Sequence, residues 1–292
     1  MKILEYLKLI RVHQWYKNLV IFLPIFFMGN LLNFSMLKEV FIGMIALCLV
    51  SSANYIINDI LDVKRDKLHP EKKHRPIASG KVSILEASII GAVLFALSLY
   101  IAQYFSLLFL LSVVFLFIST LAYSLHFKNE PILDMLLIAV NFVVRVISGA
   151  FIIKAFISPW LVLCPFFLAL FLTIGKRDAD LKVLKKDAVK HKEVLKYYDL
   201  QTTNGLMVIS TTCLILSYSL YAFSRTSWLL STLPFAIYTI YRYYSLINQG
   251  SEIARHPEKI YKDYKLMIGI LLWMIITFVI FYFILGKVTV VL

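Results

Sequence analysis

Long apolar segments recur along the whole chain and constrain its fold more than any other feature. Of 292 residues, 60% are apolar and only 16% are charged, which is more apolar surface than a water-soluble domain can bury. Segments of about 20 mostly apolar residues are long enough to cross a bilayer as helices. We therefore expect an all-α integral membrane protein with one membrane domain over residues 1–292. The predicted spans lie near residues 18–36, 40–57, 84–104, 106–125, 132–153, 158–175, 204–222, 226–247 and 266–286.

The loops between these predicted spans differ in positive charge. The formal net charge is +13, yet the loops on one side of the membrane contain only Lys38, Lys154, Arg225 and Lys287. Positively charged loops stay in the cytoplasm, so we expect a multi-pass protein of the cell (inner) membrane with a cytoplasmic N-terminus. Membrane topology then explains the basic charge, and no nucleic-acid partner is expected. The sequence predicts no oligomeric state.

A column of acidic residues begins the first long cytoplasmic loop. Asp59, Asp62 and Asp66 are spaced so that a helix would place them within roughly 60° of one another. Carboxylates stacked this closely repel each other unless a cation lies among them. Oxygen ligands favour Mg²⁺, which commonly bridges to substrate phosphate. We therefore predict that these three residues, together with Asn58, form a catalytic metal site for a diphosphate that faces the cytoplasm.

A basic segment follows the acids closely. Lys72, Lys73 and Arg75 lie within ten residues of Asp66. Cationic side chains at this position would bind the remainder of a polyanion whose diphosphate is held by the metal. The preference of positively charged loops for the cytoplasm explains why this loop is basic, but it does not explain why the basic residues lie next to the acidic ones.

Polar residues inside the fifth predicted span form one stripe. Asp134, Asn141, Arg145 and Ser148 fall within about 60° on a helical wheel. Arg145 is too deep to reach the interface cheaply, so we expect it to face a hydrated cavity or an anion. The alternative is that it pairs with Asn141 or with an acid on another span.

A second polar face occurs where the chain enters the membrane. Arg11, Gln14 and Asn18 share one helical face, with Lys17 beside them. Gln14, Lys17 and Asn18 are candidates for substrate binding. Lys17 and Arg11 could instead be interfacial anchors.

The spacing N-D-x-x-D-x-x-x-D followed by R-P-I-A-S-G resembles the UbiA superfamily of membrane prenyltransferases. The resemblance covers essentially the whole chain. It implies nine transmembrane helices around a central cavity, with acid-rich motifs after helices two and six that bind Mg²⁺ and a prenyl diphosphate. Residues 175–181 read G-K-R-D-A-D-L, which departs from the usual second motif.

With this segment, the chain resembles the polyprenyl-phosphate phosphoribosyltransferase branch of the superfamily, which serves cell-wall assembly. That branch transfers a 5-phosphoribosyl group from 5-phosphoribosyl 1-diphosphate to a polyprenyl phosphate. The segment Val12-His13 differs from the branch, which commonly has proline after the arginine. Besides the basic segment, the resemblance implies substrate-binding roles for Gln14, Lys17, Asn18, Tyr123, Lys128, Asp134, Arg145, Lys176, Arg177 and Asp178.

Three classes of function remain open at this point. A phosphorylated sugar donor with a polyprenyl phosphate acceptor needs several anion sites, which the Lys and Arg residues could supply. The alternative enzyme would transfer a prenyl group from its diphosphate to an aromatic or lipid-like acceptor, which needs fewer cations. A transporter could also contain buried Arg and Asp residues, but the charged residues concentrate on one membrane face.

Overall fold

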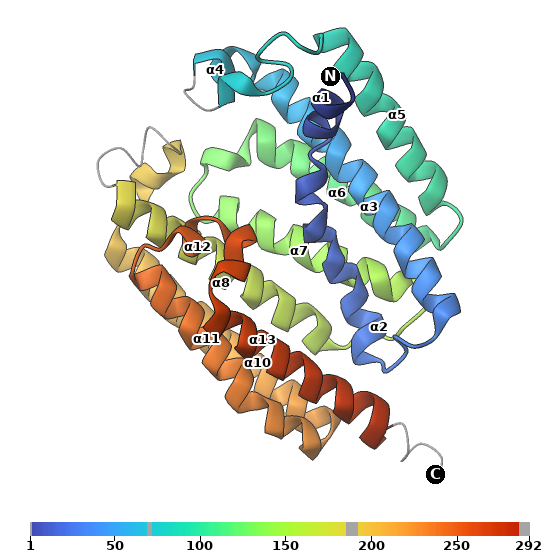
Figure 1. Cartoon of the computed structure of the whole chain (residues 1–292), viewed down its shortest axis with the longest axis vertical. Helices are drawn as coiled ribbons and strands as arrows, with labels where there is room; N and C mark the ends of the chain where they lie inside the picture. Colours follow the sequence, from blue (N-terminus) through green and yellow to red (C-terminus); the bar gives the residue numbers. More distant parts are fainter. Residues whose placement is uncertain (1, 69–71, 185–191, 286–292) are drawn as a thin grey trace. The chain divides into compact units, whose positions relative to one another are not determined.

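The computed structural model describes residues 2–68, 72–184 and 192–285, and every regular element among them is helical (Figure 1). The chain divides into two compact units. Unit 1 comprises Met1–Ile25, Asn30–Phe127 and Val144–Phe156, and unit 2 comprises Phe26–Gly29, Lys128–Val143 and Ile157–Leu292. Three helical elements contribute residues to both units: α2 (Leu23–Phe27), η3 (Phe127–Asn129) and α7 (Leu133–Ile152).

Unit 1 is organised around one long helix, α3 (Phe34–Leu61). Figure 1 shows α5 (Ile84–Ala102) side by side with α3, and α6 (Leu107–Leu125) also packs against it. Side-chain caps begin these helices, because Asn33, Ser83 and Ser106 each accept a hydrogen bond from the backbone N–H three residues on. The shorter elements of unit 1 are α1 (Lys2–Leu9), η1 (Val12–Phe22), α4 (Val63–Leu68) and η2 (Lys72–His74).

The core of unit 1 combines large apolar side chains with glycines. Leu47, Phe109 and Leu116 are among its fully buried members. A Cβ placed on Gly149 would lie 2.0 Å from the carbonyl oxygen of Ile21. Glycine at this position therefore allows the last part of α7 to approach η1 closely, as small residues do in membrane helix packing.

Unit 2 is built on two packed pairs of long helices. The helix α8 (Pro159–Leu184) packs against α10 (Leu200–Arg225), and α11 (Leu233–Asn248) packs against α13 (Tyr264–Val279) (Figure 1). Its core contains Phe171, Met207 and Ile247. The shorter elements are η3 (Phe127–Asn129), η5 (Glu193–Tyr197), η6 (Ser227–Thr232), α12 (Glu252–Arg255), η7 (Pro257–Lys262) and η8 (Ile280–Leu285).

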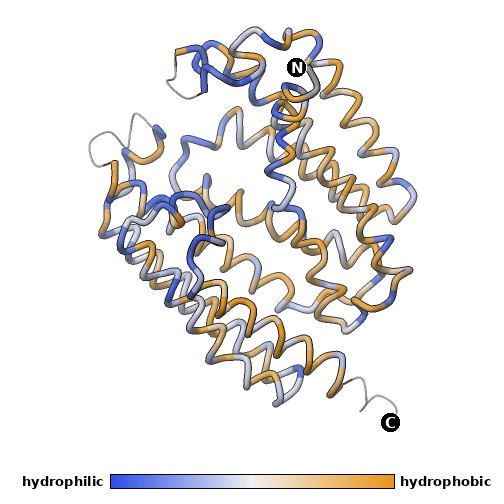
Figure 2. The backbone as a smooth tube through the Cα atoms, in the orientation of Figure 1, coloured by the Kyte–Doolittle hydropathy of each residue, from blue (hydrophilic) through white to orange (hydrophobic). Residues whose placement is uncertain are grey.

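Seven described helices are long and apolar enough to cross a membrane, which agrees with seven of the predicted spans. Many of their large apolar residues are exposed, as lipid-facing side chains must be, and Figure 2 shows hydrophobic residues along α5 and α6. The protein is therefore a multi-pass membrane protein. These seven helices are Phe34–Leu61, Ile84–Ala102, Leu107–Leu125, Leu133–Ile152, Pro159–Leu184, Leu200–Arg225 and Tyr264–Leu285.

The two other predicted spans differ from single long helices. Over residues 18–36 the chain forms the end of η1, then α2, and then a turn before α3. Over 226–247 it forms the short η6 followed by α11, which has 16 residues. Hydropathy measures only the apolar content of a segment, so it does not detect where a helix is interrupted within that segment. The predictions of nine spans, of a cytoplasmic N-terminus and of a single domain over 1–292 stay predictions.

Candidate active site

The acidic residues lie where α3 ends. Asp59 is in the last turn of α3 and Asp66 is in α4, and both side chains are buried. Asp62 stands between the two helices and is partly exposed. Hydrogen bonds of 2.9 Å from the Asp62 N–H to the Asn58 carbonyl and from the Asp66 N–H to the Asp62 carbonyl keep helical spacing across the break. Backbone spacing close to that of a continuous helix is therefore maintained from Asn58 to Asp66, although the helix is interrupted.

Arg75 joins two of these carboxylates. Its Nη1 lies 3.0 Å from Oδ1 of Asp59 and 2.6 Å from Oδ2 of Asp66. The residues that follow it anchor this arrangement, because Ile77 is buried against Ile56 and other apolar residues of unit 1. The R-P-I-A-S-G segment therefore holds a guanidinium against the acids by burying its own apolar residues.

Arg11 is a second cation at the same acid. Its Nη2 lies 2.5 Å from Oδ1 of Asp59, and its guanidinium lies over the ring of Tyr55, 4.8 Å from the centroid. The backbone of Arg11 has a φ of 51°, in the left-handed region that non-glycine residues rarely adopt. Arg11 was absent from the predicted site residues. Its position on the same predicted helical face as Gln14 and Asn18 could have indicated that Arg11 belongs to the site.

The donor set at these acids suits a hard divalent cation. It consists of carboxylate and amide oxygens, and the Arg75 guanidinium shows that Asp59 and Asp66 can together hold a positive charge. Within the described residues, no group of three or more His, Cys, Asp or Glu side chains is gathered closely enough to form a metal site. The arrangement with Arg75 between the acids is thus one of ion pairs.

The entry segment and α7 meet through a polar contact inside unit 1. Asn18 is buried in η1, and its Oδ1 accepts a hydrogen bond of 2.9 Å from Nε of Arg145. The amide nitrogen of Asn18 also donates to the Cys48 sulfur at 3.3 Å. Of the other entry residues, Gln14 is partly buried and Lys17 is exposed. The structure therefore brings together two predicted residues that are 127 positions apart.

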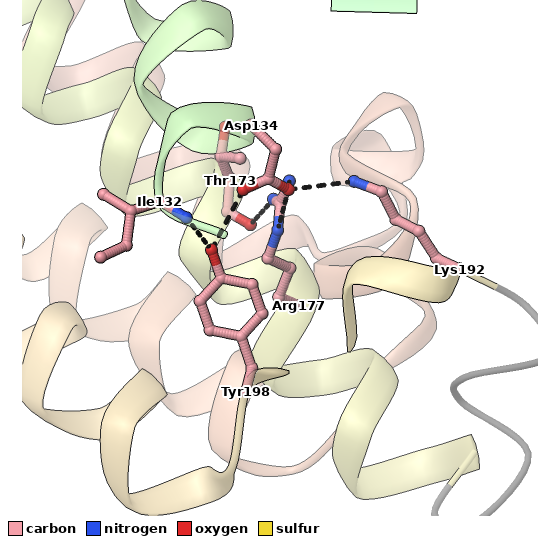
Figure 3. A network of polar contacts seen from close by, with 6 residues as sticks. All are labelled: Ile132, Asp134, Thr173, Arg177, Lys192 and Tyr198. Atoms are coloured by element: carbon pink, nitrogen blue, oxygen red, sulfur yellow. Dashed lines mark hydrogen bonds and ion pairs between the residues drawn. The ribbon is translucent and has the colours of Figure 1, made fainter. Parts of the chain in front are cut away.

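A second polar cluster lies in unit 2 around the buried carboxylate of Asp134 (Figure 3). Arg177 pairs with this carboxylate through both Nε and Nη2, and Tyr198 donates to Oδ1 from 3.0 Å. Lys192 lies 3.4 Å from Oδ2. The hydroxyl of Tyr198 also accepts a hydrogen bond of 2.6 Å from the N–H of Ile132. Two predicted residues, Asp134 and Arg177, are thus direct partners.

Lys192 and Tyr198 were not predicted as site residues. Burial, reinforced by the nearby Arg177 charge, lowers the pKa of Lys192 to about 8, although Asp134 acts in the opposite direction. Burial also raises the pKa of the Tyr198 hydroxyl to about 12. Both lie in a charged loop in which the sequence pattern does not distinguish a buried side chain from a solvated one.

The two acids of the second motif are both paired within unit 2. Asp178 is fully buried, pairs with Lys182 one turn later, and accepts a hydrogen bond of 2.8 Å from Thr203. Asp180 pairs with Arg255 of α12 at 2.8 Å. These contacts tie the end of α8 to α10 and α12.

The remaining predicted residues occupy loops and helix ends. Lys73 and Lys176 are exposed to solvent, whereas Lys72, Tyr123 and Lys128 are partly buried. Lys72 and Lys73 belong to η2, Tyr123 is near the end of α6, and Lys128 is in η3. Their expected substrate-binding roles stay predictions.

A helical multi-pass membrane fold with paired acids and bases at its helix ends defines the class of this protein. The model of the UbiA prenyltransferase family matches residues 18–257, and the chain belongs to that family. It is therefore an enzyme of the UbiA prenyltransferase family. This agrees with the family predicted from the acidic and R-P-I-A-S-G segments.

Similar proteins match nearly the whole chain. The decaprenyl-phosphate phosphoribosyltransferase of Mycolicibacterium smegmatis is 31% identical over 286 residues, covering 91% of this chain and 89% of the relative. The protein of the same name from Mycobacterium tuberculosis is 31% identical over 276 residues, covering 91% and 90%. A solved structure of a UbiA homolog from Archaeoglobus fulgidus, bound to DMAPP and Mg²⁺, has a TM-score of 0.72 at 20% identity and covers 96% of this chain and 99% of the other.

Proposed function

We propose that this enzyme transfers a 5-phosphoribosyl group from 5-phosphoribosyl 1-diphosphate to a polyprenyl phosphate, with Mg²⁺ as cofactor, and so feeds cell-envelope glycan synthesis. The observation that carries the proposal is the buried acid pair, Asp59 and Asp66, with the cations Arg11 and Arg75 directly on it. Such a site suits a substrate that brings several phosphates. The names of the relatives that match over nine tenths of the chain support the same reaction.

The metal would be held by Asn58, Asp59, Asp62 and Asp66. When bound, Mg²⁺ supplies positive charge to a diphosphate leaving group. Asp59 and Asp66 would contribute carboxylate oxygens to the metal, and Arg75, which lies directly beside both, would neutralise donor phosphates. Lys72 and Lys73 extend this positive charge along the loop.

The transfer itself needs no general base. The C1–O bond to the diphosphate breaks with its electron pair leaving on the diphosphate oxygen, while an oxygen of the acceptor phosphate forms the new bond to C1. The acceptor phosphate is ionised at neutral pH and carries no proton that must first be removed. Attack in line with the departing group would invert the configuration at C1. The protein contributes positioning and electrostatic stabilisation.

The other predicted residues receive supporting roles in this proposal. Gln14, Lys17 and Arg145 position substrate phosphates in unit 1, with Asn18 orienting Arg145 through its hydrogen bond. Tyr123 lies in the same unit. In unit 2, the substrate-binding groups proposed are Lys128, Asp134, Lys176, Arg177 and Asp178, with Asp134 orienting Arg177.

We also propose nine membrane spans, a cytoplasmic N-terminus and an active site that faces the cytoplasm of the cell (inner) membrane. The support is the placement of Lys and Arg residues in the loops. Periplasmic labelling of a tag at the N-terminus would contradict this orientation.

Mass spectrometry of the lipid product tests the reaction. Purified protein receives Mg²⁺, a polyprenyl phosphate and 5-phosphoribosyl 1-diphosphate, and we expect a phosphoribosylated polyprenyl phosphate. A parallel reaction receives dimethylallyl diphosphate with an aromatic acceptor. A prenylated product there, with no phosphoribosyl lipid in the first reaction, would reject the proposal in favour of ordinary prenyl transfer, which the family and its ligand-bound homolog make the second candidate.

A further inference from the structure

A polar cavity of about 320 Å³ opens directly beside Asp59 in unit 1. It lies where the end of α1, the start of η1 and the loop around η2 come together. No role in the reaction has so far been assigned to most of the side chains around it. The residues that line it are Lys8, Arg11, His13, Asp59, His74, Arg75 and Pro76.

The lining of this cavity is strongly cationic. Lys8, Arg11 and Arg75 are basic side chains, and Asp59 is the one acidic side chain among the lining residues. The left-handed backbone of Arg11 turns the chain between α1 and η1. Because Arg11 and Arg75 both contact Asp59, their guanidinium groups are held at the cavity wall by ion pairs. An anion entering here meets donors that are already in place.

We propose that this cavity binds a phosphate monoester, namely the 5-phosphate that the sugar donor carries in addition to its diphosphate. The inference rests on the function proposed above. Asp59, the ligand proposed for the metal at the diphosphate, forms part of the cavity wall, so a donor anchored there has its second phosphate within reach. The cavity therefore selects donors that carry a second phosphate, a group that simple prenyl diphosphates lack.

The composition of the wall argues against the acceptor phosphate as the occupant. A polyprenyl phosphate brings an isoprenoid chain, which needs an apolar path away from its headgroup. Among the described residues that line the cavity, Pro76 alone has an apolar side chain. The cavity thus suits a small, fully polar ligand.

Two lysines on the same acid provide a matched test. Nζ of Lys8 and Nζ of Lys81 lie 3.1 Å and 3.0 Å from Oε1 of Glu5, and both side chains are 52% exposed. Only Lys8 of this pair lines the cavity. Lys8→Ala and Lys81→Ala therefore each remove one positive charge and one ion pair with Glu5. Only Lys8→Ala also removes a side chain that lines the cavity.

The experiment measures dissociation constants by calorimetry on the purified full-length variants with Mg²⁺, so it does not depend on turnover. The ligands are 5-phosphoribosyl 1-diphosphate, ribose 1-diphosphate, which lacks the 5-phosphate, and a polyprenyl phosphate. We expect Lys8→Ala to weaken binding of the first about tenfold, as for loss of one charged hydrogen bond, and to leave binding of the second unchanged. Lys81→Ala should alter neither.

Three results would overturn the assignment. Equal loss for both ligands in Lys8→Ala would assign the cavity to the diphosphate, and weaker binding of polyprenyl phosphate alone would assign it to the acceptor. Unchanged binding of every ligand would remove Lys8 from substrate recognition. If the expected pattern occurs but mass spectrometry detects no phosphoribosyl lipid, the cavity assignment stands and the proposed transfer fails, so the two failures are distinguishable.

Discussion

Arg145 donates a hydrogen bond from its Nε to Oδ1 of Asn18, 2.9 Å away, and so connects α7 to η1 within unit 1. Asn18 was not among the partners considered for Arg145 from the sequence, and it is a partner that the structure adds. An amide oxygen accepts the hydrogen bond but does not neutralise the guanidinium charge. The contact fixes the orientation of the Arg145 guanidinium within unit 1.

Replacement of Arg145 tests this role. Arg145→Ala should remain folded and bind phosphate substrates about 10- to 100-fold more weakly, as expected for loss of a charge-assisted contact. Arg145→Lys keeps the charge and should retain more of the affinity. Binding measured by calorimetry in detergent would contradict the prediction if both variants matched the wild type, which would assign Arg145 to packing.

Asp62 is the most accessible of the three acids at the end of α3, so its replacement should disturb the fold least. Asp62→Asn should lower turnover by roughly a hundredfold or more, since loss of a group that stabilises developing charge has this size. Membrane insertion and the thermal unfolding midpoint should stay close to those of the wild type. Normal turnover in this variant, assayed with labelled sugar donor, would exclude Asp62 from metal binding.

Removal of the metal provides an independent test of the whole acidic site. Exhaustive treatment with EDTA should abolish turnover, because the carboxylates would have no divalent cation with which to hold the diphosphate. Added Mg²⁺ should restore it. Activity that persists in EDTA, checked by elemental analysis for residual metal, would contradict the proposed cofactor.

The close packing of α7 against η1 at Gly149 can be tested separately from catalysis. Gly149→Ala would place a Cβ 2.0 Å from the Ile21 carbonyl oxygen and should destabilise the protein by about 1 to 3 kcal/mol. Gly205 in α10 is the matched control, since a Cβ there meets nothing within 4 Å. Gly205→Ala should stabilise by about 0.5 to 1 kcal/mol, as for glycine in a helix interior. Thermal unfolding in detergent measures both, and equal midpoints would show that η1 and α7 do not pack this tightly.

The lowered pKa of Lys192 should make the stability of the protein depend on pH. This pKa is lowered to about 8 in the folded protein, below the usual value of a lysine, because the side chain is partly buried and lies near the Arg177 charge. Between about pH 8 and pH 10.5 the unfolded chain binds the extra proton, so stability should rise with pH across this window. The Lys192→Met variant lacks this titrating group. The free energy of unfolding of the wild type should therefore increase relative to that of the variant over the same pH window. A difference that stays constant with pH would show that Lys192 is solvated.

The sequence alone was sufficient for the membrane class, for the seven long helices and for the acid and base segments at the helix ends. These features depend on composition and on local spacing along the chain. The same spacing indicated that Asp59 and Asp66 share a face, and they do contact one guanidinium. The family could also be predicted, because the two segments that carry it are contiguous.

Tertiary structure alone decided which polar groups are partners. Arg11 with Asp59, Arg145 with Asn18, and Arg177 with Asp134 are separated by 48, 127 and 43 positions. Helical periodicity assigns a residue to a face of its own helix but does not say which helix packs against that face. The burial of Lys192 and the break of the first predicted span at η1 likewise depend on neighbours distant in sequence. Local patterns therefore set which chemistry the chain contains, and packing sets which groups meet to perform it.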